Sequence, residues 1–154
     1  MLNAVIFDFR RTLYDPDTNS LMPNANDLLY ELVERGYSMA LVAKGDPDAT
    51  GALLESLDIR GFFRRVRCLE GEKTEYVFDQ CAKEMRYQNY EIAVVGNSIR
   101  QEIRLANRLG MYTILFRNGF HTGHAPENEA EKPRVTIASL DEVLNYLPPI
   151  EFTD

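Results

Sequence analysis

Short apolar runs alternate with stretches of helical periodicity along this chain. Near-continuous apolar runs, which are typical of strands buried on both faces, predict strands at 4–7, 38–42, 66–68, 92–95, 112–116 and 135–137. Between them, apolar residues recur three and four positions apart, and this spacing predicts helices. Strands that alternate with helices imply right-handed crossovers and parallel pairing. We therefore predict an α/β fold, a three-layer α/β/α Rossmann-like arrangement around a mostly parallel sheet, in a single domain spanning 1–154.

Turn-forming and capping residues set the limits of these elements. The turn-rich segment within 12–22 predicts a small hairpin after the first strand. Asn24 is expected to cap the first helix, Asp46 the second, and Ser139 to open a capping box at the last. The apolar face of the first helix is expected to consist of Leu28, Leu29, Leu32 and Val33.

The composition describes an ordinary soluble protein. The chain has 154 residues, of which 45% are hydrophobic and 27% charged. Apolar runs are all shorter than the ~20 residues that a membrane-spanning helix needs, and Asp8 interrupts the first run, which argues against a signal peptide. Cys68 and Cys81 form no CxxC pair and are expected to be core residues. We expect a cytoplasmic protein, because a reducing compartment suits free thiols.

The net charge of −7 argues against broad nucleic-acid binding and against binding to anionic membranes. Arginines concentrate at 60–67, around the third predicted strand. We interpret this cluster as a sheet-edge strand that charge protects from pairing with other chains. The alternative is a docking surface for an acidic or phosphorylated partner. The arginines concerned are Arg60, Arg64, Arg65 and Arg67.

A long polar loop is predicted at 117–134. His121 and His124 lie in it, near Glu127 and Glu129, so a metal clip is one interpretation. A solvated loop is the interpretation that its polar, glycine-containing composition favours.

Asp8 follows the first predicted strand directly. In open α/β sheets, ligands bind at the carboxyl ends of the strands, so a carboxylate there is a candidate for catalysis. An aspartate just past a strand is also a common turn former, and this residue alone leaves both interpretations open.

Four segments, in order and at matching strand ends, resemble the motifs of the haloacid dehalogenase-like hydrolases. They are the nucleophile loop at 8–13, the segment 41–46, Lys73 at the head of the third helix, and 94–103. The resemblance covers essentially the whole chain. It implies the fold of that family without a cap domain, because one helix and its flanking elements fill each interval between Asp8, Ala43 and Lys73.

The resemblance also implies an activity. Asp8 stands at the position of the nucleophile, which forms an aspartyl-phosphate, and Lys73 at that of the lysine that balances charge. The positions that bind Mg²⁺ are Asp8, Asn97 and Glu102. The positions that bind substrate are Thr12, Ala43, Lys44 and Gly45.

Four residues depart from the family pattern. Arg10 stands where the family has its general acid and base, and a guanidinium stays protonated and offers no acceptor. Loss of such a group costs about 10²–10⁴ in rate. Ala43 lacks the phosphate-binding hydroxyl, Asn97 is a neutral ligand that weakens Mg²⁺ binding, and Glu102 carries its charge one methylene further out.

We therefore expect a phosphatase-type hydrolase whose activity is impaired or specialised, acting on a phosphorylated small molecule or macromolecule. The alternative is a catalytically inactive binding or assembly module in which Arg10 pairs with Asp8 or Glu102. A third hypothesis is that Arg10 contacts a second anionic group of the substrate. The open site also suits a homo-oligomer in which a neighbouring subunit acts as the lid.

Overall fold

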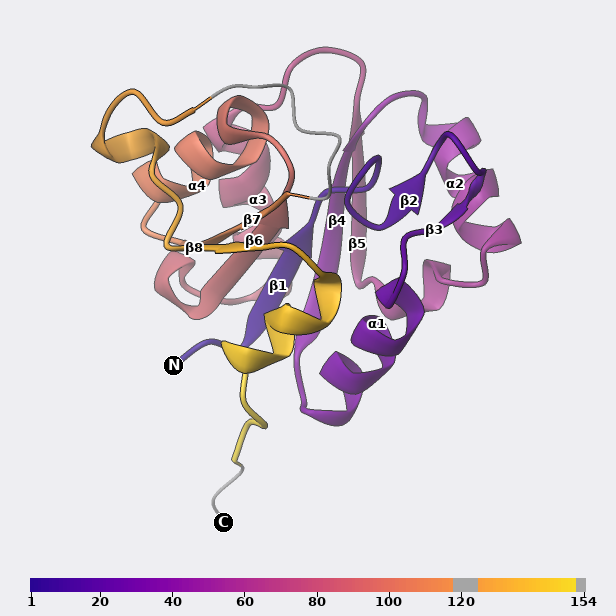
Figure 1. Ribbon diagram of the computed structural model, residues 1–154, viewed down its shortest axis with the longest axis horizontal. Helices are drawn as coiled ribbons and strands as arrows, with labels where there is room; N and C mark the ends of the chain where they lie inside the picture. Colours follow the sequence, from indigo (N-terminus) through magenta and orange to yellow (C-terminus); the bar gives the residue numbers. More distant parts are fainter. Residues whose placement is uncertain (118–124, 152–154) are drawn as a thin grey trace.

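The computed structural model describes residues 1–117 and 125–151 and contains one large parallel sheet (Figure 1). The sheet has six strands in the order β5-β4-β1-β6-β7-β8. All neighbouring pairs in it are parallel, as the alternating pattern predicted. The strands are β1 (Ala4–Phe7), β4 (Ser38–Lys44), β5 (Arg65–Leu69), β6 (Ile92–Gly96), β7 (Tyr112–Phe116) and β8 (Val135–Ile137).

A small antiparallel hairpin follows β1, as predicted, and the helices lie between the strands. The hairpin strands are β2 (Tyr14–Asp15) and β3 (Ser20–Leu21). The longer helices are α1 (Ala25–Glu34), α2 (Pro47–Ser56) and α3 (Glu75–Met85). A π-helical turn, η3 (Ile99–Ile103), continues into α4 (Arg104–Arg108). The 3₁₀ helices are η1 (Arg60–Phe62), η2 (Asn89–Glu91), η4 (Glu129–Glu131) and η5 (Leu140–Asn145).

Strand β1 is the centre of the packing. All of its residues are buried, and successive side chains point to opposite faces. Val5 and Phe7 belong to the core under α1 and η5, whereas Ala4 and Ile6 belong to the core under α3 and α4. Helices therefore cover both faces of the sheet (Figure 1), which confirms the three-layer prediction. Only the hairpin and α1 lie between β1 and β4, so the described chain has no cap domain there.

Some local predictions about helix ends and faces are wrong. Val33 is 47% exposed, although Leu28, Leu29 and Leu32 are buried as predicted. Asn24 adopts φ 70° and does not cap α1; its amide donates to Ser139 Oγ instead, at 3.2 Å. Asp46 does cap α2, because its carboxylate accepts from the backbone N–H of Ala49. The capping box of Ser139 forms, but the helix that it opens is a 3₁₀ helix.

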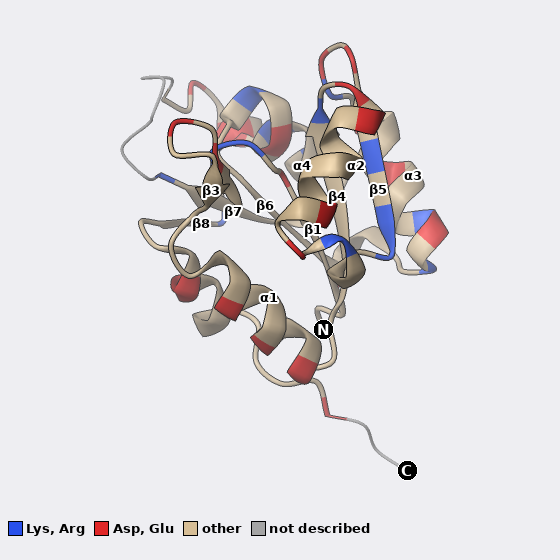
Figure 2. Ribbon diagram, turned by 90° about the vertical axis from the view of Figure 1, so that its right-hand side faces the viewer, with Lys and Arg blue, Asp and Glu red and all other residues tan. Residues whose placement is uncertain are grey.

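The arginine-rich strand β5 lies at the edge of the sheet, as predicted. Arg65 and Arg67 both pair with Glu84 of α3, at 4.0 and 3.1 Å. Figure 2 shows the basic residues along β5 and the acidic residues along α1 on separate parts of the surface. The edge position of β5 is confirmed, and the protection of this edge by charge stays a prediction.

Two further predictions concern the remaining parts of the chain. His121 and His124 lie outside the described residues. Cys81 is fully buried and Cys68 partly so, and burial raises the pKa of the Cys81 thiol to about 11. Within 1–117 and 125–151, no helix combines the length and apolar character needed to cross a membrane.

Candidate functional site

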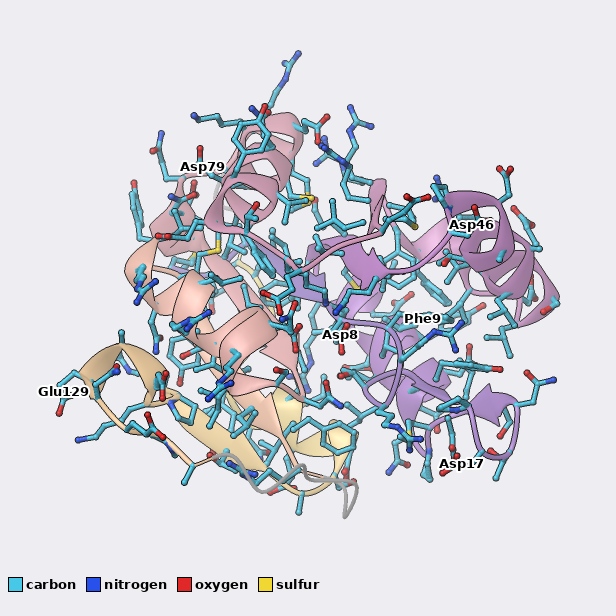
Figure 3. The ribbon with its side chains drawn as sticks, turned by 90° about the horizontal axis from the view of Figure 1, so that it is seen from above. Asp8, Phe9, Asp17, Asp46, Asp79 and Glu129 are labelled. Atoms are coloured by element: carbon cyan, nitrogen blue, oxygen red, sulfur yellow. The ribbon has the colours of Figure 1, made fainter. Side chains whose placement is uncertain are left out.

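The candidate site lies where the strand order changes direction. From β1 the chain continues to β4 and β5 on one side and later to β6, β7 and β8 on the other. Such a switch point leaves a crevice outside the carboxyl ends of the central strands. Asp8 follows β1, Lys44 ends β4, and Asn97 follows β6. Figure 3 shows Asp8 near the middle of this side of the molecule, with Asp17 on the hairpin and Asp46 at the head of α2.

Asp8, Lys73 and Glu102 form a buried ionic cluster, which we call the Asp8 cluster. The Nζ atom of Lys73 lies 2.6 Å from Asp8 Oδ1 and 2.9 Å from Glu102 Oε2. The Lys73 side chain is only 2% exposed. The hydroxyl of Thr12 donates to Asp8 Oδ2 at 3.0 Å, so both oxygens of Asp8 accept a hydrogen bond. These bonds fix the orientation of the carboxylate.

The position of Glu102 depends on Gly96 at the end of β6. A Cβ atom at residue 96 would lie 2.4 Å from Glu102 Cγ and 2.6 Å from its Oε1, which is far inside contact distance. The backbone N–H of Ser98 donates to Glu102 Oε1 at 3.0 Å. Glu102 lies within the π-helical turn η3, a geometry that occurs often at functional sites. Glycine at residue 96 therefore makes room for the Glu102 side chain, which is one methylene longer than an aspartate.

Burial and neighbouring charge shift the pKa values in this cluster. Burial raises the pKa of Glu102 to about 7, and Asp8 adds to the increase, while Lys73 and the Ser98 N–H oppose it. Burial alone lowers the pKa of Lys73, but the adjacent Asp8 and Glu102 outweigh it and raise the pKa overall. The ammonium of Lys73 therefore stays charged between the two carboxyl groups.

A cavity of about 180 Å³ opens above the Asp8 cluster. It is lined by Asp8, Arg10, Lys44, Lys73, Asn97, Ser98, Gln101 and Glu102. A larger hollow of about 800 Å³, next to Tyr30 and Phe62, contains none of the cluster residues. We place the candidate site at the smaller cavity, because the buried ionic groups with shifted pKa values lie there.

The structure brings most, but not all, of the predicted site residues to this cavity. Gly45, with φ 129°, is not part of the lining, and its N–H donates to Leu69 in the next strand. Thr12 is fully buried, and its hydroxyl orients Asp8. Ala43 is 1% exposed and belongs to the hydrophobic core. Of the four predicted substrate-binding positions, Lys44 is therefore the one that lines the cavity.

Two lining residues were missed, although both lie within the segment 94–103. The side chain of Gln101 accepts from the backbone N–H of Lys73 at 2.9 Å. Ser98 caps η3 by accepting from the N–H of Gln101. Both connect the loop after β6 to the Asp8 cluster, and the motif pattern alone does not show which way they point.

Arg10 makes a contact that differs from the expected one. Among the described residues, neither Asp8 nor Glu102 forms an ion pair with its guanidinium; both pair with Lys73. The Cζ atom of Arg10 lies 5.6 Å from the centre of the Tyr14 ring, which is a cation–π arrangement. The hypothesis of an inactive module expected Arg10 to pair with Asp8 or Glu102, and that expectation is therefore wrong.

The oxygen donors at the cavity fit a magnesium ion only in part. Both oxygens of Glu102 accept hydrogen bonds, from Lys73 and Ser98. The amide of Asn97 lines the cavity and has no hydrogen-bond partner within the described part of the chain. Mg²⁺ in proteins is commonly held by one or two carboxylates, with water and substrate phosphate completing its octahedron. The carboxylate oxygens of Asp8 and Glu102 each already accept a hydrogen bond from the protein, so a magnesium ion would be held by Asn97 together with the remaining lone pairs of these carboxylates.

A family model and two named relatives match much of the chain. A family model described as haloacid dehalogenase-like hydrolase matches residues 2–110. Two glyceraldehyde 3-phosphate phosphatases are 28% identical to the chain: that of Methanopyrus kandleri over 129 residues and that of Pyrococcus abyssi over 102. The alignments cover 81% and 64% of the chain, but 55% and 43% of the relatives, so the chain spans about half their length.

Solved structures show the same fold. A HAD phosphatase from Thermococcus onnurineus superposes with a TM-score of 0.83 at 14% identity, covering 96% of this chain and 99% of that one. The HAD-hydrolase YfnB from Bacillus subtilis, solved bound to magnesium, superposes with a TM-score of 0.72 at 16% identity, covering 84% of this chain and 57% of that one.

Proposed function

The chain belongs to the haloacid dehalogenase-like hydrolase family, and we propose that it is a phosphatase-type hydrolase whose nucleophile is Asp8. One observation carries this proposal. The Asp8 carboxylate is held by Lys73 on one oxygen and Thr12 on the other, at the floor of an open cavity. A nucleophile fixed beside a cation is what attack on an anionic phosphoryl group requires.

The residues of this chain support the first half of such a reaction. A carboxylate oxygen of Asp8 attacks phosphorus, the bond from phosphorus to the leaving oxygen breaks, and an aspartyl-phosphate forms. Lys73, already 2.6 Å from Asp8, stays charged and offsets the negative charge that collects there. A magnesium ion bound by Asp8 and Asn97 would neutralise the phosphoryl oxygens.

Both halves of the reaction lack a proton carrier. Arg10 lines the cavity at the acid/base position, but a guanidinium neither gives up a proton nor accepts one from water. The leaving oxygen must therefore depart without protonation. This favours acyl and aryl phosphates, whose leaving groups are stable as anions, and it slows hydrolysis of the aspartyl-phosphate.

The names of the relatives support a small substrate. Both are glyceraldehyde 3-phosphate phosphatases, so a phosphorylated small molecule is the substrate class that we propose for this chain.

The experiment is to trap the intermediate. The protein is incubated with acetyl phosphate and Mg²⁺, and its intact mass is measured over time. We expect the gain of one phosphoryl group that persists, because hydrolysis is slow. Asp8→Asn is the control and should gain none. A wild-type protein that stays unmodified would contradict the proposal.

A second candidate function is that of a binding module without catalysis. The observation in its favour is that both oxygens of Asp8 and both of Glu102 have protein donors, so the cluster is satisfied without a ligand. Calorimetry separates the two functions. Binding of Mg²⁺ that disappears in Asp8→Asn supports the hydrolase, and the absence of Mg²⁺ binding together with no trapped intermediate supports the module.

A further inference from the structure

Two cations line the cavity without a carboxylate partner. Arg10 and Lys44 are both exposed, and neither side chain forms an ion pair or hydrogen bond with any residue in 1–117 or 125–151. Some cations elsewhere in the chain are paired, such as Arg35 with Glu31 at 3.0 Å and Arg67 with Glu84 at 3.1 Å. We call Arg10 and Lys44 the cationic rim. Its charges are available to a ligand that enters the cavity.

Arg10 is held in place although it has no anionic partner. Its guanidinium lies over the ring of Tyr14, which is only 4% exposed. Tyr14 stacks on Phe9 with ring centres 5.1 Å apart and planes 7° from parallel, and its hydroxyl donates to Asn19. A guanidinium that packs on a fixed ring loses less freedom when it binds an anion. The site is therefore preorganised for a charged group.

The cations at the cavity outnumber its carboxylates. Arg10, Lys44 and Lys73 face Asp8 and Glu102, an excess of cations in a chain whose net charge is −7. Lys73 lies on Asp8 itself, where the phosphoryl group would react. The cationic rim is then left for another anionic group, and such a local field also attracts anionic ligands.

We propose that the cationic rim binds a second anionic group of the substrate, so that the preferred substrates are small phosphate compounds that also carry a carboxylate or a second phosphate. This inference rests on the proposed function, because it takes the Asp8 end of the cavity as the phosphoryl site. Arginine suits this role, since its planar fork donates two parallel hydrogen bonds to a carboxylate or phosphate. On this account, Arg10 at the acid/base position selects substrates.

The test compares ligands that differ in one group. Glyceraldehyde 3-phosphate and 3-phosphoglycerate differ only in an aldehyde against a carboxylate. Glycerol 3-phosphate and glycerol 1,3-bisphosphate differ in a hydroxyl against a phosphate. Binding is measured by calorimetry on Asp8→Asn, which lacks the nucleophile, so that turnover does not interfere. Comparing the two pairs shows whether carboxylate or phosphate is the better second group.

We expect each compound with two anionic groups to bind about tenfold more tightly than its matched partner, and the preference to fall by most of that factor when Arg10→Met or Lys44→Met is added. Arg108→Met removes the same charge from an exposed residue outside the cavity and should preserve the preference. Equal binding within each pair, no binding of any compound, or a preference that survives both rim substitutions would overturn the inference. A trapped aspartyl-phosphate together with equal binding would show that the inference fails while the proposed function stands.

Discussion

The Nζ atom of Lys73 lies 2.6 Å from Oδ1 of Asp8, although the two residues are 65 positions apart. The contact joins the loop after β1 to the head of α3, and it places a cation beside two carboxyl groups that are otherwise buried together. A buried pair of this kind contributes little compared with a well-packed apolar pair, but removing one partner is costly.

Replacing Lys73 by methionine should destabilise the protein by about 3–5 kcal/mol, because Asp8 and Glu102 are then left facing each other without a cation. Urea unfolding of Lys73→Met measures the effect. Lys83→Met is the matched control, since Lys83 pairs with Asp79 at 2.9 Å on the exposed side of α3 and should matter little.

A rescue experiment separates the effect of the unpaired buried charges from the effect of lost side-chain packing in Lys73→Met. Adding Asp8→Asn and Glu102→Gln to Lys73→Met removes both buried charges and should recover most of the lost stability. A Lys73→Met protein as stable as the wild type, or a triple variant with no recovery, would show that the cluster carries no such electrostatic cost.

Glu102 should make stability depend on pH in a defined window. Its ordinary pKa of 4.5 applies in the unfolded chain, and burial raises the pKa to about 7 in the folded protein. Between these values the folded state binds more protons than the unfolded state, so this group's contribution to stability falls as pH rises, by up to about 1.4 kcal/mol per pH unit.

The measurement is the free energy of unfolding of the wild type minus that of Glu102→Gln, taken at several pH values between 4.5 and 7. The difference should decrease across this range. A difference that stays flat or grows with pH would mean that Glu102 is already ionised in the folded protein below pH 5, held so by Lys73.

Gly96→Ala should destabilise the protein, because the added Cβ overlaps with Glu102 at 2.4 Å and the buried carboxyl side chain has no room to move. Overpacking of this kind costs about 1–3 kcal/mol. Gly51→Ala is the matched control: it lies in α2 with no atom within 4 Å of the added Cβ. There the same substitution should stabilise the helix by about 0.4–1 kcal/mol. In thermal unfolding, the midpoint temperature should therefore fall for Gly96→Ala and rise for Gly51→Ala.

The strands, and the polar residues at their ends that form the site, can be predicted from the sequence for a physical reason. A strand covered on both faces must be apolar throughout, so β1 and β6 appear as uninterrupted runs, and the polar residue that ends each run marks the rim of the sheet. Asp8 and Asn97 are recognisable in this way. The edge position of β5 also follows, because arginines are tolerated where one side of a strand is open.

The arrangement within the site does not follow in the same way. Glu102 reaches Lys73 because η3 is a π-helical turn and because residue 96 has no side chain, and apolar periodicity signals neither feature. The family resemblance implies that Thr12 binds substrate, whereas its hydroxyl donates to Asp8. The contact of Arg10 with Tyr14 depends on the hairpin that brings the two together. These contacts join segments that are separate in the sequence, and local sequence patterns do not show in which direction each side chain points.

Arg10→Asp combined with Ala43→Ser should convert the protein into a faster phosphatase on unactivated esters. The aspartate restores a group that can protonate the leaving oxygen, and the serine restores the hydroxyl that the family pattern has at residue 43. Serine is preferred to threonine because Ala43 is 1% exposed and the core there leaves little space.

Glycerol 3-phosphate is the substrate of choice, since its alcohol leaves poorly without a proton and it has no second anion for the cationic rim. Steady-state release of phosphate should rise by about 10²–10⁴ over the wild type. The control is Arg10→Asn with Ala43→Ser, which carries the same change at residue 43 and a side chain of the same shape at residue 10 but cannot transfer a proton. If the two double variants release phosphate at the same rate, proton transfer at residue 10 is not what limits this site.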